Sequence, residues 1–453
     1  MDQHGDFSRG SVKGHIFQQA WPMIIAQLVG VLYSVADRMF IGHMPDVGSE
    51  ALTGIGILFP VITLVNAFAN WGGQGGAALF AMARGRGDEK RAMKIMGNTC
   101  LLFIVFTFIL CGLGYGLESS LLRAFGGSDE TIPYASDYLR IYLAGTFFQL
   151  ISLGLNPYFG ASGFPRQGML AVIIGAGFNL ALDPVFIFSW HMGIRGAAYA
   201  TLLSQFLSAA WTLCFLSSKK RRYRLSWVSL RYDASCVREI LYLGFANFLF
   251  QLTNALTQAV SNKVLYAWGG DLQVAIMTVV QTLRQIFCMP LNGLTNAAKP
   301  VLSYNYGAKR GDRVVEGIAI MTRCGLWTTG IVSAIALIFP RQLIALFTTD
   351  TQVILEGATP MRIFFLFFLF FSFQISGQST FTALGFAKEA TFFSLLRKVF
   401  LILPLTLILP YFMGARGVFT AEAVSQIVGG SACYLTMYRR VYCRLKNGLE
   451  VRD

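Results

Sequence analysis

Residues 16–41 read IFQQAWPMIIAQLVGVLYSVADRMFI, and their only charged residues are Asp37 and Arg38. A helix that spans a bilayer needs about 20 mainly apolar residues. The run is longer than the apolar core of a signal peptide and no small-residue cleavage site follows it, so we expect it to be retained. It predicts the first membrane-spanning helix.

Runs of the same kind recur along the whole chain, with a polar stretch at 218–236 between the sixth and the seventh. They predict an all-α membrane protein of about twelve transmembrane helices. The predicted spans are 16–41, 52–80, 93–116, 134–157, 168–190, 194–217, 238–266, 272–298, 317–340, 358–384, 390–413 and 416–438.

The composition agrees with a lipid-facing surface. Of 453 residues, 55% are hydrophobic and 13% are charged, whereas about 25% of the residues of a soluble domain are charged. The net charge of +14 comes from short basic stretches between apolar runs. This distribution is typical of membrane topology and argues against a nucleic-acid-binding groove.

The basic stretches lie in alternate loops. One set of loops holds 84–94, 219–224, 309–313 and 439–446, and the other set holds most of the loop carboxylates. The positive-inside rule then places both termini in the cytoplasm, which requires an even number of spans.

The chain repeats itself. Gly193–Gly196 recurs as Gly414–Gly417, and Arg86–Asp88 recurs as Arg310–Asp312, at offsets of roughly 221 to 226 residues. We therefore expect two six-helix bundles, 1–217 and 238–453, joined by a cytoplasmic linker at 218–237. With six spans each, they would run in the same direction about a pseudo-two-fold axis along the membrane normal.

No motif points to an enzyme or a resident cofactor. GxxxxGK[ST], HExxH and a suitable GxSxG are absent, so we expect neither ATP hydrolysis nor hydrolytic catalysis. Eight scattered cysteines without a CxxC predict no disulfide framework and no cysteine metal site. Active transport would then depend on an ion gradient and on carboxylates within the membrane.

The candidate carboxylates are Asp37, late in the first predicted span, and Asp183, late in the fifth. A charge within a span is costly and usually faces a cavity or a partner. Structural alternatives remain for both. In these, Asp37 pairs with Arg38 or lies at the interface near Gly42, and Asp183 caps a helix beside the kink at Pro184.

The neighbours of Asp183 favour an ion site. Asn179 lies four residues earlier on the same helix face. The turn into the next helix centres near Met192, so Thr201 faces Asp183 across the hairpin, with the Ala197 carbonyl one turn away.

Pro184 also lacks an N–H, which frees a backbone carbonyl. Asp37 can close this set of oxygen ligands, which suits Na⁺, and a desolvated carboxylate there can equally carry a proton.

The second half lacks these acids. The repeat aligns Leu409 with Asp183, and Ser261 with Asp37, so we expect ion coupling in the N-terminal half. Lys263, Arg284 and Glu422 are the charged residues noted near spans there, and each is expected to reach a helix end.

Polar, small-residue stretches are candidates for a substrate cleft or for close helix packing. They supply Tyr33, Asn66, Trp71, Gln74, Asn292 and Asn296 as candidate substrate contacts. The phenylalanine-rich run 364–373 is expected to face lipid.

Three segments together resemble the MATE (multidrug and toxic compound extrusion) family. They are Tyr33–Gly42 (YSVADRMFIG), Asn179–Pro184 (NLALDP) and Gly196–Thr201 (GAAYAT). Ser303–Lys309 (SYNYGAK) is similar to its MepA-like bacterial branch.

The resemblance implies two six-helix bundles that alternate in access across a bacterial plasma membrane. It implies a monomer that exports cationic or amphipathic compounds in exchange for Na⁺ or H⁺. The family's cation site would fall on Asp37, Asn179, Asp183 and Thr201, and its helix-bending proline on Pro22. The chain departs from the branch with an essential acid in the seventh helix, because 238–266 holds only Glu239 at its edge.

The alternative is a flippase for lipid-linked oligosaccharide or peptidoglycan precursors, a related fold. Such a protein would grip a pyrophosphate with several cations, for which the sequence offers Arg38, Lys263 and Arg284. A membrane-embedded enzyme would need a catalytic histidine or a carboxylate pair at one interface, and the sequence shows neither.

Overall fold

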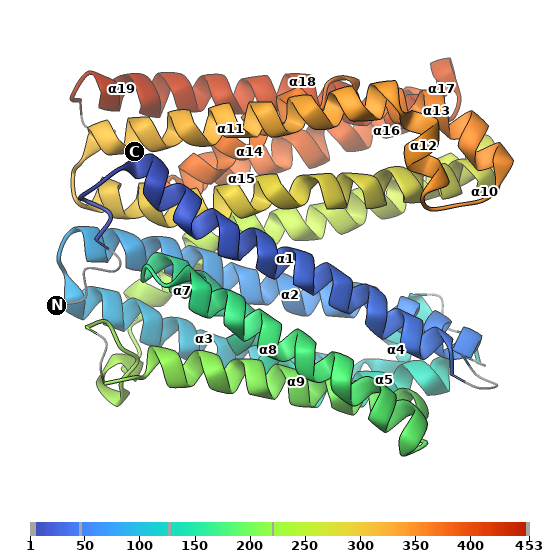
Figure 1. The fold of residues 1–453 in the computed structure, drawn as a ribbon, viewed down its shortest axis with the longest axis horizontal. Helices are drawn as coiled ribbons and strands as arrows, with labels where there is room; N and C mark the ends of the chain where they lie inside the picture. The colour runs from blue at the N-terminus through green and yellow to red at the C-terminus, as the bar shows by residue number, and fades with distance from the viewer. Residues whose placement is uncertain (1–5, 45–47, 126–127, 130, 220–221, 450–453) are drawn as a thin grey trace. The chain divides into compact units, whose positions relative to one another are not determined.

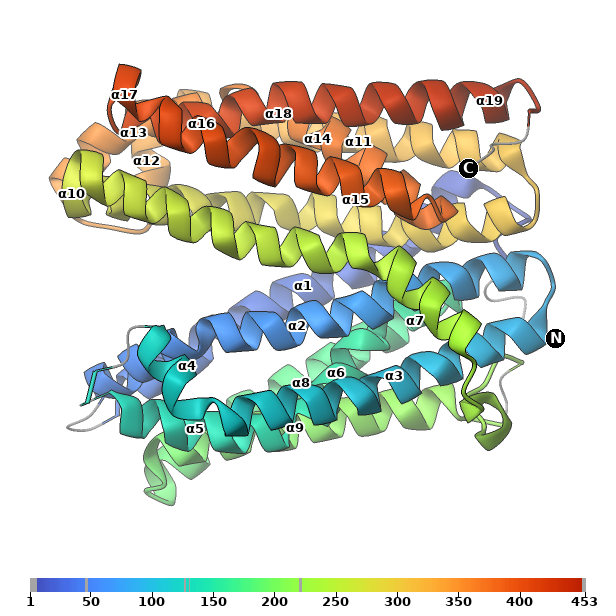
Figure 2. The same ribbon diagram turned by 180° about the vertical axis from the view of Figure 1, so that it is seen from behind.

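The computed structural model describes residues 6–44, 48–125, 128–129, 131–219 and 222–449, and all regular structure in these ranges is helical. The chain divides into two compact units, which are described separately. Figures 1 and 2 show the helices from opposite sides.

The first unit holds residues 21–248. Its helices are α1 (Val12–Gly42, from Trp21), α2 (Gly48–Gly85), α3 (Glu89–Gly116), α4 (Glu118–Ala124), α5 (Ile132–Ala144), α6 (Thr146–Gly154), α7 (Asn156–Ala161), α8 (Pro165–Pro184), η1 (Val185–Ser189), α9 (Gly193–Leu216), η2 (Trp227–Leu230) and the start of α10 (Ala234–Gly307).

The second unit holds residues 7–20 and the chain from Leu249. Its helices are the rest of α10, then α11 (Gly311–Ile338), α12 (Pro340–Ala345), α13 (Thr351–Leu366), α14 (Leu369–Leu384), α15 (Ala387–Leu395), η3 (Leu396–Ile402), α16 (Leu403–Ile408), α17 (Pro410–Met413), α18 (Arg416–Met437), η4 (Tyr438–Tyr442) and α19 (Cys443–Lys446).

The described helices account for the twelve predicted spans. Eight are long and apolar enough to cross a membrane, and two further spans are bent pairs, α5 with α6–α7 at 60° and α13 with α14 at 45°. Helix α10 holds two predicted spans and breaks at Gly270. The φ angle of Gly270 is 64°, a backbone conformation that glycine adopts readily. Helix α18 completes the set. The predicted all-α membrane class is confirmed.

The compact units do not begin and end where the sequence placed the bundles. Residues 7–20 belong to the second unit because Arg313 donates hydrogen bonds to the carbonyls of Phe7 and Gly10, at 2.8 and 2.9 Å. Residues 238–248 belong to the first unit, where Trp71 donates to the Leu241 carbonyl at 2.8 Å and stacks on Phe248. Loops mark where helices end, whereas contacts decide which helix segment packs with which unit.

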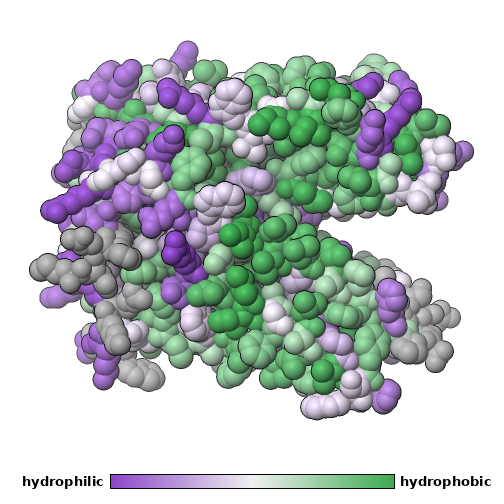
Figure 3. All heavy atoms as spheres, viewed as in Figure 1, coloured by the Kyte–Doolittle hydropathy of each residue, from purple (hydrophilic) through white to green (hydrophobic). Residues whose placement is uncertain are grey.

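The surface of each unit is that of a membrane protein. On the face shown in Figure 3, hydrophobic residues cover much of the sides of the helices, and hydrophilic residues gather toward the helix ends. Exposed aromatic and aliphatic side chains such as Phe108, Trp327 and Phe412 are at least 75% accessible. Apolar side chains this exposed fit a lipid environment.

Hydrogen bonds and an ion pair join the linker to α3 in the first unit. Asn98 donates to the Arg231 carbonyl and accepts from the N–H of Asp233 at 2.9 Å. Asp233 also pairs with Lys94 and accepts from the N–H of Ser235 at the start of α10. These hydrogen bonds hold the pKa of the Asp233 carboxyl well below its usual range.

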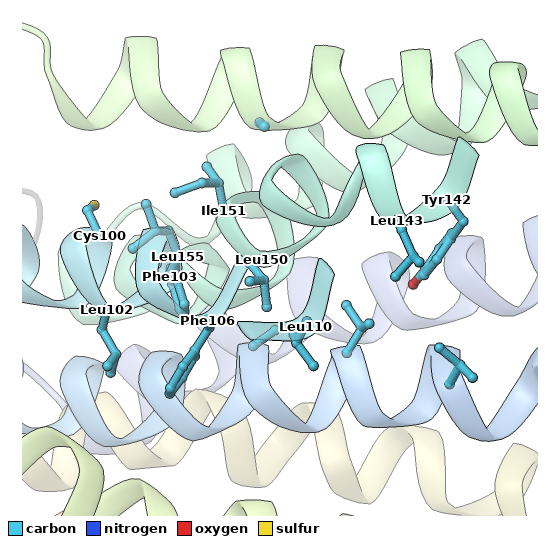
Figure 4. Close-up of a cluster of buried hydrophobic side chains, with 14 of the residues drawn as sticks. Cys100, Leu102, Phe103, Phe106, Leu110, Tyr142, Leu143, Leu150, Ile151 and Leu155 are labelled. Atoms are coloured by element: carbon cyan, nitrogen blue, oxygen red, sulfur yellow. The ribbon is translucent and has the colours of Figure 1, made fainter. Parts of the chain in front are cut away.

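The core of the first unit forms where α3 meets α6. Figure 4 shows Phe103 and Phe106 of α3 beside Leu150, Ile151 and Leu155. Glycines let these helices approach: a Cβ at Gly154 would collide with the Phe103 ring. Close packing through small residues is a general means of joining helices in lipid.

Helix α10 approaches α2 through another glycine, which gives a test of this packing. A Cβ at Gly244 would overlap the Trp71 carbonyl, which cannot move without bending α2. We expect Gly244→Ala to lower the melting temperature and the yield of monodisperse protein in detergent. Gly56→Ala is the matched control, because no atom lies within 4 Å of its added Cβ. Equal stability of the two variants would contradict this packing.

Candidate functional site

The two intramembrane acids of the N-terminal half, Asp37 and Asp183, lie close together in the structure. Asp37 lies in the last turns of α1, and Asp183 lies at the end of α8 beside Pro184. Their carboxyl groups lie close enough to interact electrostatically with each other. Asp183 is completely buried, and one oxygen of Asp37 is buried without a hydrogen-bond partner.

Pro184 changes the helix at this point. The chain continues from Asp183 as a π-helix over Val185–Ser189. Proline cannot donate an N–H, so the regular hydrogen-bond ladder of α8 is interrupted beside the acid. Single π-helical turns often occur at functional sites.

Asn179 and Thr201 complete the cluster, as the spacing predicts. In the amide orientation that satisfies both of its ends, Asn179 donates to Asp183 Oδ2 at 2.8 Å and accepts from the Thr201 N–H at 3.3 Å. The Thr201 hydroxyl lies 3.4 Å from the hydroxyl of Tyr138. Apart from Tyr138, the residues of this network (Asn179, Asp183 and Thr201) all come from the α8–α9 hairpin.

Ala197 is fully buried one turn before Thr201. Its neighbour Gly196 packs on the backbone of Phe186, two residues beyond Pro184, where a Cβ would collide. The hairpin is therefore tight at this depth, and the Ala197 carbonyl as an ion ligand stays a prediction.

Three tyrosines surround the acids. Tyr33, on α1 one turn before Asp37, lies close enough to interact electrostatically with Asp37 and Asp183. The sequence assigned it to the substrate cleft. Tyr138 and Tyr142 of α5 stack at 6.2 Å between centroids. Sequence reasoning missed these two, although their spacing of four places both on one face of a predicted span.

The closeness of the two acids limits the charge states that the pair can take. Ionised carboxylates are acceptors only, so two of them share a hydrogen bond only when one carries a proton. Like charges at close range disfavour ionisation of both groups, so the pair favours a proton or another cation beside it. The oxygens of Asp37, Asp183 and Thr201 are of the kind that Na⁺ prefers.

Arg38 is not that cation. Its guanidinium is exposed and lies over the Phe59 ring, 5.9 Å from the centroid. Among the described residues, no ion pair within 4.0 Å joins it to Asp37. The alternative of a local Asp37–Arg38 pair is therefore wrong.

The predicted substrate contacts of the first unit make packing contacts. Asn66 accepts a hydrogen bond from Gln149 at 2.9 Å. Trp71 packs among Phe106, Phe245 and Phe248, with its indole N–H on the Leu241 carbonyl. Gln74 is half-buried in the same helix.

In the second unit, Asn296 accepts from Lys299 at 3.2 Å, and the Asn292 carbonyl accepts from Thr295. Phe364, Phe365, Phe368 and Phe371 form part of the core of this unit. The expectation that this run faces lipid is wrong for these four residues, because one face of each helical turn packs against the core while the opposite face stays exposed.

The second unit also buries a charged cluster that sequence reasoning missed. Arg397 and Lys398 are buried on η3, and Arg397 pairs with buried Glu422 of α18 at 2.6 Å. Glu422 therefore does not reach a helix end, contrary to expectation. Two adjacent cations within the apolar run 390–413 were the available signal.

The comparisons agree with this architecture. A model of the MatE family matches residues 22–185 and again 243–408. The two matches begin 221 residues apart (22 and 243), within the offset of the repeat.

Curated relatives include the multidrug export proteins MepA of Staphylococcus haemolyticus (strain JCSC1435) and Staphylococcus aureus (strain NCTC 8325 / PS 47). The first is 22% identical, with 98% of this chain and 96% of the relative covered. The second is 24% identical, with 95% of each covered.

Solved structures of similar fold include an outward-facing multidrug resistance MATE family transporter of the MOP superfamily. It has a TM-score of 0.91 at 24% identity and covers 98% of this chain and 99% of that one. A MATE protein in the bent conformation has a TM-score of 0.92 at 24% identity, with 99% of each chain covered. The family matches span more than half of the sequence, and this membrane protein therefore belongs to the MatE family of transporters.

Proposed function

We propose that this protein is a secondary multidrug exporter that exchanges cationic or amphipathic compounds for Na⁺ or H⁺ by alternating access. The single observation that carries the proposal is the buried pairing of Asp37 with Asp183. The printed names of the MepA relatives support the multidrug part.

The pair would couple ion and substrate through charge. With its proton or Na⁺ bound, the site carries one negative charge fewer and is less costly to enclose in a low-dielectric interior. When the ion leaves, the pair again attracts a cation. An organic cation and the coupling ion would then favour opposite states of the transporter, as exchange requires.

Helix α1 is suited to respond to this change. It carries Asp37, and only 6% of the residues in its most apolar stretch are buried. Few packing contacts therefore resist its movement. Pro22 removes one backbone hydrogen bond of α1 and lies beside the junction of the two units in sequence. We propose Pro22 as the point at which α1 bends.

The direct test is ethidium efflux from proteoliposomes that contain the purified protein, with Na⁺ and H⁺ gradients imposed separately. Efflux driven by one gradient would support the exchange and identify the ion. No efflux under either gradient, from protein that elutes as a folded species, would overturn the proposal in favour of a flippase. We expect the working unit to be a monomer in a bacterial plasma membrane, with both termini in the cytoplasm.

Asp37→Asn is expected to reduce gradient-driven efflux by roughly tenfold. The substitution removes one charge of the pair but leaves Asp183 with Asn179 and Thr201. The initial rate of dye efflux at matched protein density measures the loss. Arg38→Gln is the control and should keep its rate, because Arg38 is exposed and unpaired with Asp37. Full activity of Asp37→Asn would remove Asp37 from the site.

A further inference from the structure

A small polar cavity lies within the second unit, away from the acid pair. Segments from α10, α13, η3, α16 and α18 line it. Its volume is about 40 Å³, by a measure in which one water occupies about 10–15 Å³. Its polar and charged lining residues are Asn254, Thr257, Gln258, Ser261, Gln281, Arg284, Lys398, Thr406 and Glu422.

The charges around this cavity are unbalanced. Two cationic side chains, Arg284 and Lys398, line it with one acid, Glu422, which is already paired with Arg397 outside the lining. Glu422 pairs with Arg397 at 2.6 Å, and Arg284 donates to the neutral amide of Gln281 at 2.7 Å. Within the described part of the chain, no carboxylate lies within 4.0 Å of the Lys398 ammonium. The cluster therefore holds more cationic side chains than acidic ones.

Several hydrogen-bond donors of the cluster are unused. Arg397 is 1% exposed, yet its Nε and Nη1 atoms have no hydrogen-bond partner. The buried hydroxyl of Thr406, which lines the cavity, also has none. Buried donors without acceptors are rare because each loses its hydrogen bonds to water.

The excess of cationic side chains and the unpaired Thr406 hydroxyl in the lining favour the same partner. An uncompensated charge in a membrane interior is strongly unfavourable, and an anion in the cavity would offset it. The anion would also accept hydrogen bonds from the cavity's hydroxyl and amide groups. A cation would meet the cationic side chains of Arg284 and Lys398 there and is disfavoured.

We propose that this cavity of the C-terminal unit binds one monovalent anion, either chloride or a carboxylate group of a transported compound. The volume suits an ion or group of this size and is too small for a diphosphate or a whole aromatic drug. The site is opposite in charge to the acid pair of the first unit. Ser261, which the repeat aligns with Asp37, lines the cavity beside Lys398.

The test measures the melting temperature of the purified protein in detergent at constant ionic strength. The starting buffer contains only a bulky sulfonate anion, which is then replaced stepwise by chloride, acetate or pyrophosphate. An anion that binds only the folded protein raises the melting temperature in a concentration-dependent way. We expect a saturating rise of several degrees with chloride, acetate or both, and the more effective of the two identifies the source.

Variants place the effect in the cavity. Lys398→Gln should weaken the half-saturating concentration at least tenfold. Lys299→Gln is the matched control, because Lys299 contacts Asn296 outside the cavity lining, and its response should equal that of the wild type. If Lys398→Gln does not fold, Ser261→Asp supplies a fixed carboxylate and should abolish the response.

Three outcomes would overturn the proposal. The first is an identical effect of all anions, which indicates ionic strength alone. The second is an unchanged chloride or acetate response in both Lys398→Gln and Ser261→Asp. The third is a response to pyrophosphate only, which would indicate a diphosphate site. The test does not measure transport, so it stands apart from the ion-coupled export proposed above.

Discussion

Asp183→Asn is expected to reduce gradient-driven efflux to the level of empty liposomes. Asparagine has nearly the same shape as aspartate and keeps an oxygen that can accept from Asn179, so the α8–α9 hairpin should persist. It cannot take up a proton and has no charge to bind Na⁺. Asp37 alone would then have no partner carboxyl with which to share a cation. The initial rate of ethidium efflux under each ion gradient measures the effect.

Asp137→Asn is the matched control for this variant. Asp137 belongs to the same unit, but it is partly exposed and pairs with exposed Arg195 at 3.0 Å. A surface pair of this kind contributes about 0–1 kcal/mol to stability. Efflux by Asp137→Asn should therefore equal that of the wild type. Undiminished efflux by well-folded Asp183→Asn would exclude Asp183 as the coupling residue.

Glu422→Ala is expected to lower the free energy of unfolding by about 3–5 kcal/mol, because removal of one partner leaves a buried charge without compensation. Arg397 would lose its 2.6 Å ion pair while it remains enclosed near the Phe371 ring. Lys398, also buried on η3, would lose the nearest negative charge of the cluster. Denaturant titration of the purified protein in mixed micelles measures the change.

The control is Glu389→Ala in the same unit. Glu389 pairs with Arg440 at 3.0 Å, but the arginine side chain is 67% exposed. Its loss should cost less than about 1 kcal/mol. A double variant, Arg397→Met with Glu422→Leu, should recover most of the stability lost in Glu422→Ala, since apolar residues can replace a buried pair. Equal destabilisation by Glu422→Ala and Glu389→Ala would contradict the burial argument.

The site around the acid pair shows what residue spacing along the sequence can predict. The sequence indicated that Asn179 and Asp183 share a helix face and that Thr201 faces them across a tight hairpin, and the structure brings all three together. These residues belong to consecutive helices, so helical period and loop length suffice to relate them. Tyr138 and Tyr142 reach the same site from α5. Spacing within the α8–α9 hairpin does not predict that contact.

The charged cluster of the second unit shows what residue spacing along the sequence cannot predict. The sequence displays Arg397, Lys398 and Glu422 but not that α18 carries Glu422 against η3. A charged side chain in a span can face lipid near a helix end or face a partner, and both choices have the same local sequence. Only the way in which the helices pack decides between them.

The sequence by itself determined the membrane environment, the twelve spans, the internal repeat and the residues of the α8–α9 hairpin. Hydrophobic length, charge distribution and helical period are local properties, and the bilayer acts on each span separately. The tertiary structure alone decided that residues 7–20 and 238–248 pack across the expected bundle boundaries, that Tyr33 lies with the acids, and that Arg397 is buried against Glu422. These outcomes depend on contacts between distant segments, because side-chain fit and charge compensation select among arrangements that satisfy the bilayer equally well.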